Sequence, residues 1–506
     1  MNTATDTPAA PAERRLHPWS WLFVLLQQLR QFVVPLVALV VFGRRGPSNM
    51  ADWAPLMGVA ALVGISVLQY FTYRYRIGSS GITIRNGLLQ RTWREIPFAR
   101  IHNVALHQTL LHRIFGVAEV RLEAAGGRRP EAQMRVLGLA DALALEQLVR
   151  HRGGGTAGTP APAAAQAQDE VLLALPPAEV VRLGLVSNRG MIVVAAGLGA
   201  VAQMLPDQMA AGWVTYLLEE VLDELLGQAR RMRLGWAGTA AAALVLFSLA
   251  VAALRLLSVA LALAQYFGFR LTGDRRRLTV ERGLFARLRS SVAPRRIQAW
   301  YLQETLLHRL LGRRSLRIDT AVGGREDDPR KLRDLAPIAT PATCDALVGR
   351  LLPGVAWPPP HWQRLPPGTA WRLFAGDLPW TLLVAAVLAW QFGAWGLLAL
   401  LWLPWAAYAA WRQAGYMGYA VDARLVAVRG GWWSRWWRFA EIDKLQGLRL
   451  TRSPVDRWLG TASLWLDTAG AGGMSPPLRI RFLPEAQARA LYRQLGRTLA
   501  ARRLRW

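Results

Sequence analysis

Six apolar stretches, arranged as three pairs, constrain the fold of this chain more than any other feature. In chain order the pairs are 21–42 with 53–71, 191–205 with 237–267, and 378–391 with 394–411. Their lengths of roughly 14–30 residues bracket the about 20 that a helix needs to cross a bilayer. Because basic, polar sequence follows each pair, we expect three transmembrane hairpins rather than buried core helices.

Charge and cysteine content narrow the class of protein further. The 506 residues carry a net charge of +28, so the chain must lie near something anionic. The apolar pairs favour a membrane surface over nucleic acid. The single cysteine, Cys344, forms no internal disulfide and is typical of domains in a reducing cytoplasm. We expect no cleavable signal peptide, because the first apolar stretch lacks a small-residue cleavage site.

The polar sequence after each hairpin repeats three times. Apolar and polar residues alternate around a glycine turn, which predicts paired strands, in segments 82–88, 278–284 and 425–431. A second shared segment has an Arg-x-x-Gly core and reads as a short helix, at 108–116, 304–312 and 453–460. Each copy then closes with a helical stretch, at 139–151, 341–352 and 484–501. The sequence therefore predicts a multi-pass α-helical membrane protein with α+β soluble units.

These repeats set the domain boundaries. We divide the chain into a disordered N-terminus (1–15), an interfacial helix with the first hairpin (16–72), the first unit (73–152), a linker (153–174), the second hairpin (175–266) with an outer insertion (206–235), the second unit (267–352), a linker (353–364), the third hairpin (365–411) and the third unit (412–506). The basic units should be cytoplasmic by the positive-inside rule, and both termini with them. The protein would then lie in a bacterial inner membrane.

The array resembles the bacterial PH-like membrane-flanked domain family, in its long YdbT-like form with three repeated units. An Ile/Leu-Gln step, the downstream Arg-x-x-Gly and an Asp-Thr-Ala turn carry the resemblance. The Asp-Thr-Ala turns are 319–321 in copy two and 467–469 in copy three, whereas copy one has Glu-Ala-Ala at 123–125. The resemblance implies three PH-like domains, each a bent β-sandwich capped by a C-terminal helix and preceded by a transmembrane helical hairpin. It implies no defined activity.

Two patterns could carry chemistry, and both favour a structural role. Asp319 and Asp467 in Asp-Thr-Ala steps are similar to the paired motifs of a two-lobed aspartic protease. Alanine replaces the usual glycine in both, however, and copy one lacks the aspartate, so a turn that binds backbone amides is the better interpretation. His102, His107 and His112 are spaced by five, which aligns no metal ligands on a helix. We interpret His112, which recurs as His308, as a surface position that tolerates polar groups.

The candidate contacts are arginines and tryptophans. Arg113, Arg309 and Arg457 recur in the short helix and either contact anionic headgroups or bond carbonyls at the helix end. The stretch 432–438 interleaves the two residue types that suit a membrane interface. Its candidate lipid or partner contacts are Trp432, Trp433, Arg435, Trp436, Trp437 and Arg438. Alternatively these tryptophans pack a domain core, and in a strand each Trp-Trp pair should then send one ring outward.

The sequence favours a non-enzymatic membrane scaffold that presents PH-like domains to partner proteins or anionic lipid, in envelope maintenance or defence. The alternative is a transporter or a component of a lipid-handling membrane complex, for which Arg30, Arg189 and Arg255 near the membrane are the argument. An enzyme ranks last, and we expect no cofactor, no metal and no nucleic acid. The expected partners are the bilayer and either a smaller single-unit relative or a second copy.

Overall fold

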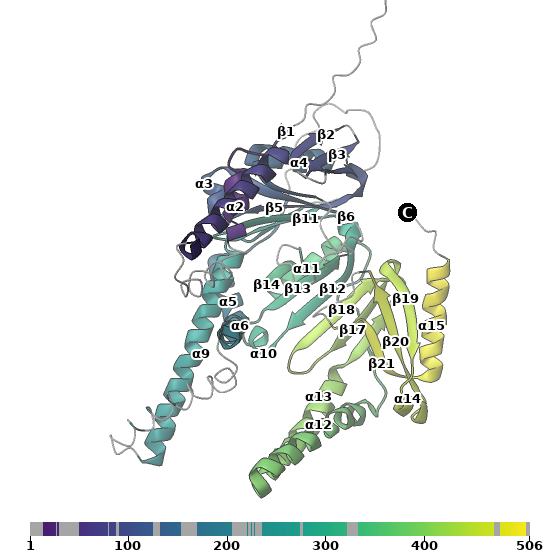
Figure 1. Cartoon of the computed structure of the whole chain (residues 1–506). Helices are drawn as coiled ribbons and strands as arrows, with labels where there is room; N and C mark the ends of the chain where they lie inside the picture. The colour runs from purple at the N-terminus through teal and green to yellow at the C-terminus, as the bar shows by residue number, and fades with distance from the viewer. Residues whose placement is uncertain are drawn as a thin grey trace, which may run out of the picture.

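The structure is a computed structural model, drawn as a ribbon in Figure 1. It describes residues 14–26, 28–29, 50–78, 80–87, 91–124, 132–152, 170–204, 220, 224, 227, 235–273, 277–320, 332–469 and 476–501. Most of the first predicted span (21–42), the outer insertion (206–235) and the first linker (153–174) lies outside the described residues, as do both chain ends.

The three units repeat one order of elements. The first contains β1 (Arg14–Arg15), β2 (Arg74–Ile77), β3 (Gly81–Asn86), β4 (Thr92–Pro97), β5 (Ile101–Gln108), α3 (Leu110–Ile114), β6 (Val117–Ala124), β7 (Ala132–Gly138) and α4 (Leu139–Arg152). The second contains β8 (Glu170–Ala174), β9 (Arg270–Gly273), β10 (Leu278–Arg282), β11 (Arg287–Val292), β12 (Ile297–Glu304), α10 (Leu306–Leu310), β13 (Arg314–Thr320), β14 (Asp334–Ala339) and α11 (Pro341–Leu351). The third contains β15 (Gln363–Arg364), β16 (Gly418–Val421), β17 (Leu425–Gly430), β18 (Arg435–Glu441), β19 (Leu445–Thr451), α14 (Pro454–Trp458), β20 (Thr461–Thr468), β21 (Arg479–Pro484) and α15 (Glu485–Ala500).

Each hairpin is inserted inside its unit, after the first strand. β8 precedes the second hairpin in the chain yet pairs with β9, which follows it. β1 pairs with β2 and β15 with β16 in the same way. The predicted boundaries therefore need correction, because the N-terminus and both linkers contribute a strand each. The cause is long-range pairing, which strands of only two to five residues do not reveal in the sequence.

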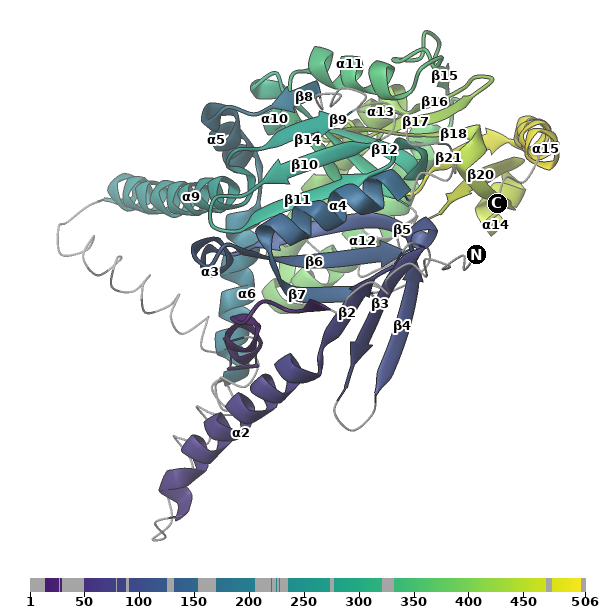
Figure 2. The same ribbon diagram turned by 90° about the horizontal axis from the view of Figure 1, so that it is seen from above.

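The units are fused through their sheets rather than strung as separate domains. β5 of the first unit pairs with β11 of the second, which gives one seven-stranded sheet in the order β7-β6-β5-β11-β10-β9-β8. Figure 2 shows β5 and β11 side by side at this junction. β12 and β18 join the second and third units in a further seven-stranded sheet. A four-stranded sheet (β1 to β4) and a three-stranded sheet (β19 to β21) end the array.

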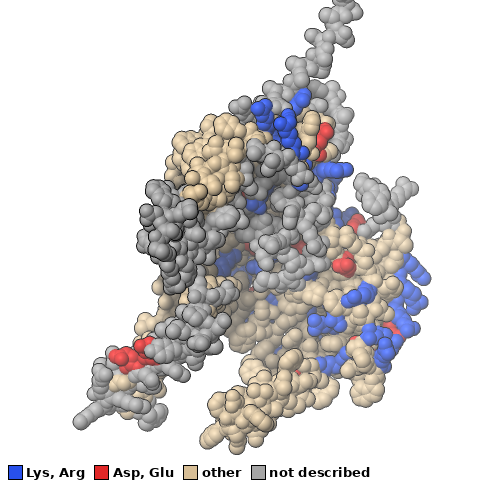
Figure 3. Space-filling view, viewed as in Figure 1, with Lys and Arg blue, Asp and Glu red and all other residues tan. Residues whose placement is uncertain are grey.

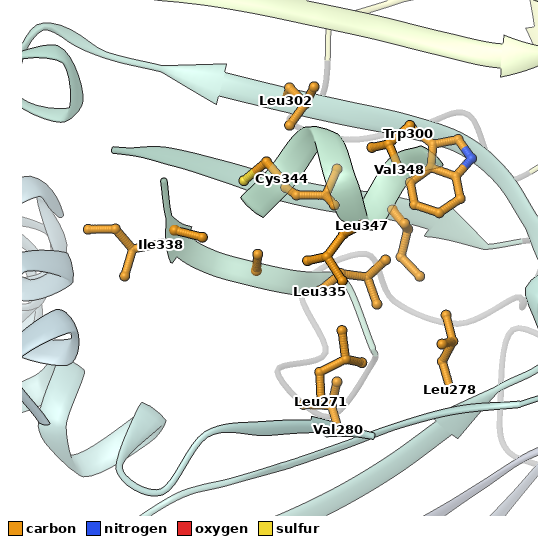
Figure 4. Close-up of a cluster of buried hydrophobic side chains, with 14 of the residues drawn as sticks. Leu271, Leu278, Val280, Trp300, Leu302, Leu335, Ile338, Cys344, Leu347 and Val348 are labelled. Carbon is orange, nitrogen blue, oxygen red and sulfur yellow. The ribbon is translucent and has the colours of Figure 1, made fainter. Parts of the chain in front are cut away.

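Apolar side chains from both junction strands fill the cores. The second unit's core, shown in Figure 4, gathers Leu271 and Val280 from one sheet, Leu302 from the other and Leu347 from α11. Cys344 lies in the same core, and burial raises the pKa of its thiol to about 12. A cysteine held in this protonated form is a poor nucleophile.

The hairpin helices project from the sheets. They are α2 (Met50–Thr72) in the first hairpin, α5 (Pro177–Val186), α6 (Arg189–Met204) and α9 (Trp236–Tyr266) in the second, and α12 (Thr369–Phe392), the 3-10 helix η4 (Gly393–Leu401) and α13 (Trp402–Tyr416) in the third. Among the described residues, 237–266 and 369–416 are long and apolar enough to cross a membrane, and α5 with α6 forms a bent pair at 55°. In Figure 1, α9 and α12 both extend toward the lower left, whereas Figure 2 shows α2 extending in a different direction from α9, so three parallel hairpins stay a prediction.

Candidate membrane-surface site

The short helix of each unit begins with the same cap. The side chains of Thr109, Thr305 and Ser453 accept hydrogen bonds from the third residue of their helices, which is His112, His308 or Asp456. These three residues are 8%, 6% and 4% exposed. In the second and third units the side chain also bonds back to the cap, which completes a capping box.

The interpretation of His112 and His308 as tolerant surface positions is therefore wrong, since they are buried parts of a helix cap. Burial, helped by the charge of Arg317, lowers the pKa of His308 to about 4. Burial by itself would raise the pKa of Asp456, but hydrogen bonds from Ser453, Arg372 and Thr461 outweigh it and hold the pKa low. The groups with shifted pKa values in these short helices therefore stabilise the helices.

The other side of the short helix exposes large apolar residues. Directly after the recurrent arginines stand Ile114, Leu310 and Trp458, which are 75%, 73% and 86% exposed. A glycine with φ near +60° ends each helix two residues later, a conformation that other residues rarely adopt. We call Ile114, Leu310 and Trp458 the apolar tips.

Each short helix touches the start of its own hairpin. In the first unit the rings of Trp19 and Phe115 lie 4.7 Å apart. In the second, Arg313, just after α10, donates to Glu179 of α5 at 2.8 Å. In the third, Arg372 of α12 donates to Asp456 of α14 at 2.5 Å. The tips therefore lie beside the point where each apolar hairpin leaves its unit.

The predicted arginines lie beside these tips. Arg113, Arg309 and Arg457 are all exposed. Arg113 donates a hydrogen bond of 3.1 Å to the carbonyl of Leu284 in the second unit. No bond from Arg309 or Arg457 to carbonyls of its own helix end is seen in the described part of the chain. The structure thus brings a cation and an apolar residue to the same place three times.

The tryptophan stretch is divided between several roles. Trp432 packs on Trp405 and Tyr408 of α13, whereas Trp433 is 54% exposed. Trp436 packs on the third unit's core and Trp437 on the second unit's core. Neither ring of this second pair points to solvent, because a junction strand has a core on each face. The expectation of one outward ring per pair is therefore wrong here.

Arg438 is buried and therefore does not contact lipid. It is 1% exposed and donates to Asp319 Oδ2 at 2.7 Å and to the carbonyl of Pro476. Asp319 thus forms an ion pair that joins the second and third units. Asp467 lies in the separate three-stranded sheet. The structure does not pair these two carboxylates, which leaves the protease interpretation without a site.

The membrane arginines of the second hairpin bond within the protein. Arg255 of α9 donates to the carbonyls of Leu185 (2.9 Å) and Ser187 (3.2 Å), at the break between α5 and α6. Arg189 donates to Gln265 and to the Tyr266 hydroxyl. Unsatisfied backbone groups are costly in lipid, so these contacts explain both arginines structurally. Within the described residues, no group of three or more potential metal ligands occurs.

A row of small sheet units, each closed by a helix and interrupted after its first strand by apolar sequence, defines a transmembrane protein with tandem PH-like domains. The family described as "Bacterial PH domain" matches residues 22–153, 221–339 and 372–499, more than half of the chain. The chain therefore belongs to the bacterial PH domain family. It is similar to the UPF0699 transmembrane protein YdbT of Bacillus subtilis (strain 168), with 22% identity over 417 residues, 80% of this chain and 82% of that protein. No solved structure matches.

Proposed function

We propose that this protein is a non-enzymatic scaffold of the bacterial inner membrane. Its PH-like units stand at the cytoplasmic face and bind anionic lipid or partner proteins. The observation that carries the proposal is the repeated pairing of an exposed arginine with an exposed apolar tip beside each hairpin.

Physical chemistry supports this placement of the short helices. An exposed Trp458 or Leu310 gains free energy when it inserts between headgroups, and an adjacent guanidinium gains about 1 kcal/mol near an anionic surface. Three such contacts on one chain would hold its units against the bilayer, in addition to the spans. Figure 3 shows Lys and Arg gathered over the third unit, while the hairpin below it is mostly tan.

The proposal assigns no catalytic step. The strongly shifted groups have structural partners: His308 and Asp456 cap helices, and Asp334 is held ionised between Arg282 and Arg317. This buried carboxylate, which pairs with two cations and accepts a hydrogen bond from the Tyr266 hydroxyl, is a structural anchor for the sheet.

Single-cysteine variants labelled with a polarity-sensitive dye test the placement. Cys344 is buried, so Trp458→Cys and Leu310→Cys would be the labelled sites, with Glu281→Cys on β10 as the matched control. In nanodiscs with anionic lipid we expect the two tip labels to shift to the blue and to resist a water-soluble quencher. The control label should stay quenchable.

Adding Arg457→Glu to the Trp458→Cys protein should weaken the shift only when the lipid is anionic. Tip labels as quenchable as the control would refute the membrane-surface role. A reconstituted protein that moved lipid between leaflets would replace the scaffold with the lipid-handling alternative.

A further inference from the structure

The foot of the third hairpin carries arginines from three neighbouring strands. Arg364 lies on β15 just before α12 begins, Arg429 lies on β17, and Arg435 begins β18. β18 is also the strand that pairs with β12 at the second junction, which joins the second and third units. The guanidiniums of Arg429 and Arg435 lie 5.3 and 4.9 Å from the ring centroid of Tyr416, the last residue of α13. Two cations are thus held at one phenol ring where α13 meets the third unit (Figure 1).

Gly418 lets the side chain of Arg429 lie toward β15. This glycine stands opposite Arg364 on one side and opposite Arg429 on the other. A Cβ at Gly418 would lie 3.3 Å from Arg429 Nε and 2.9 Å from the carbonyl oxygen of Gln363. The guanidinium of Arg429 also lies 4.7 Å from the ring centroid of Trp362. The side chain of Arg429 therefore passes over the glycine toward Arg364 and is held there by aromatic contacts.

These three arginines have no anionic partner in the described part of the chain. The Nε atoms of Arg429 and Arg435 are buried without a hydrogen-bond partner there. Glu304 lies opposite Arg435 in the sheet, but it pairs with Arg314 at 3.3 Å. Burial lowers the pKa of Arg429, and the like charges of Arg364 and Arg435 lower it further. Because these cations repel one another in a partly dry place, an anion between them would relieve the repulsion.

The second hairpin shows what such a cluster binds. Its last helical residue, Tyr266, also has two guanidiniums over its ring, those of Arg189 and Arg282, each 4.8 Å from the centroid. There the chain supplies its own anion, because Asp334 accepts hydrogen bonds from the Tyr266 hydroxyl and from Arg282 (3.3 Å). The third hairpin has a tyrosine and two cations in a similar arrangement, but among the described residues no carboxylate is bonded to them. An anion from outside the chain would complete this second cluster.

We propose that Arg364, Arg429, Arg435 and Tyr416, which we call the phosphate site, bind the phosphate of an anionic phospholipid. A guanidinium binds phosphate oxygens through two parallel hydrogen bonds, and the Tyr416 hydroxyl donates a further one. The site adjoins residues 369–416, which are long and apolar enough to cross a membrane. A headgroup therefore enters the site from the adjacent leaflet while its acyl chains lie along the hairpin.

This inference rests on the proposed position of the units at the membrane surface, but it does not depend on the apolar tips. No residue of the phosphate site belongs to a short helix. The tip-label experiment can therefore fail while the phosphate site binds lipid, and an empty phosphate site would leave the tip labels unaffected.

Native mass spectrometry of the full-length protein in mild detergent tests the site. We expect Arg429→Gln with Arg435→Gln to bind phosphatidylglycerol about 100-fold more weakly, because each charged hydrogen bond to a phosphate contributes about tenfold. Arg449→Gln with Arg479→Gln is the matched control, since these guanidiniums also lie over one ring, that of Trp465, at 5.2 and 4.5 Å. The control should bind as the unmodified protein does. Equal binding by all three proteins, or equal losses in both double variants, overturns the proposal.

A single variant excludes misfolding as the cause. Arg364 is exposed, so Arg364→Gln should fold normally and still bind phosphatidylglycerol about tenfold more weakly. Zwitterionic phosphatidylcholine should bind equally to Arg364→Gln and to the unmodified protein, because its choline cation is repelled by the remaining arginines. Unchanged phosphatidylglycerol binding by Arg364→Gln contradicts the site.

Thermal unfolding distinguishes the lipid from free phosphate as the ligand. Short-chain phosphatidylglycerol should raise the melting temperature of the unmodified protein more than that of Arg364→Gln. Inorganic phosphate at the same concentration should shift both proteins equally, because without acyl chains it gains nothing from the hairpin. A larger shift of the unmodified protein by inorganic phosphate, matching that by the lipid, would identify a soluble anion as the ligand and overturn the assignment to lipid.

Discussion

Arg438 of the third unit and Asp319 of the second form an ion pair of 2.7 Å in which Arg438 is 1% exposed. Burial lowers the pKa of Arg438, and the charge of Asp319 opposes that shift. Taking two charges from water costs several kcal/mol, so such a pair contributes less to stability than to the choice of register. It fixes which strand of the third unit can join the second.

Asp319→Ala should therefore destabilise the second junction severely. It leaves Arg438 buried with one carbonyl partner, which costs about 3–5 kcal/mol. Asp467→Ala is the matched control, because this exposed aspartate has the same register position and should change the free energy of unfolding by under about 0.5 kcal/mol. Limited proteolysis and urea unfolding measure the difference. Equal stabilities of the two variants would contradict the structural role.

The repeat and its strand-turn-strand order could be predicted from the sequence because each has a local signature. The fused sheets could not, since pairing β5 with β11 joins residues 179 to 185 positions apart and needs no special residue. The sequence does not predict the positions of Trp436 and Trp437 for the same reason: both faces of β18 are covered by cores that only the junction creates.

The capping boxes could be predicted from the sequence in part. Ser453 followed three residues later by Asp456 is the usual pattern at a helix start. Thr305 with His308 hides it, because histidine is an unusual third residue. The apolar tips also left a signal in the sequence, as the bulky residue after each recurrent arginine. Their exposure depends on which side of the helix faces the sheet, which only the fold decides.

The capped His308 should make stability depend on pH. Its pKa is about 4 in the folded chain and about 6.5 when unfolded, so below pH 6.5 the unfolded chain binds a proton that the folded one does not. Unfolding free energy should then fall by about 3 kcal/mol between pH 6.5 and 4. His308→Gln keeps a capping side chain without titrating, and its stability should fall less over this range. Parallel pH curves for the two proteins, followed by thermal unfolding, would contradict the assignment.

Gly190 should resist substitution, because it lets α6 approach α9 closely. A Cβ at this position would lie 2.5 Å from the Leu254 carbonyl oxygen and 2.6 Å from Ser258 Oγ. Gly190→Ala should cost about 1–3 kcal/mol in detergent. Gly197→Ala in the same helix meets nothing within 4 Å and should be neutral or slightly stabilising. The melting temperatures of the Gly190→Ala and Gly197→Ala variants test this prediction, which is wrong if the two temperatures are the same.

Variants of Arg255 distinguish a structural role of this residue in the second hairpin from a role in a transport pathway. It donates to the carbonyls of Leu185 and Ser187, so Arg255→Met should leave both without that donor and cost about 1–3 kcal/mol. Arg255→Lys should recover part of the loss, because one ammonium can reach a carbonyl. Thermal unfolding in detergent measures both variants. If Arg255 instead served a permeating solute, Arg255→Met would leave stability unchanged and alter only flux in proteoliposomes.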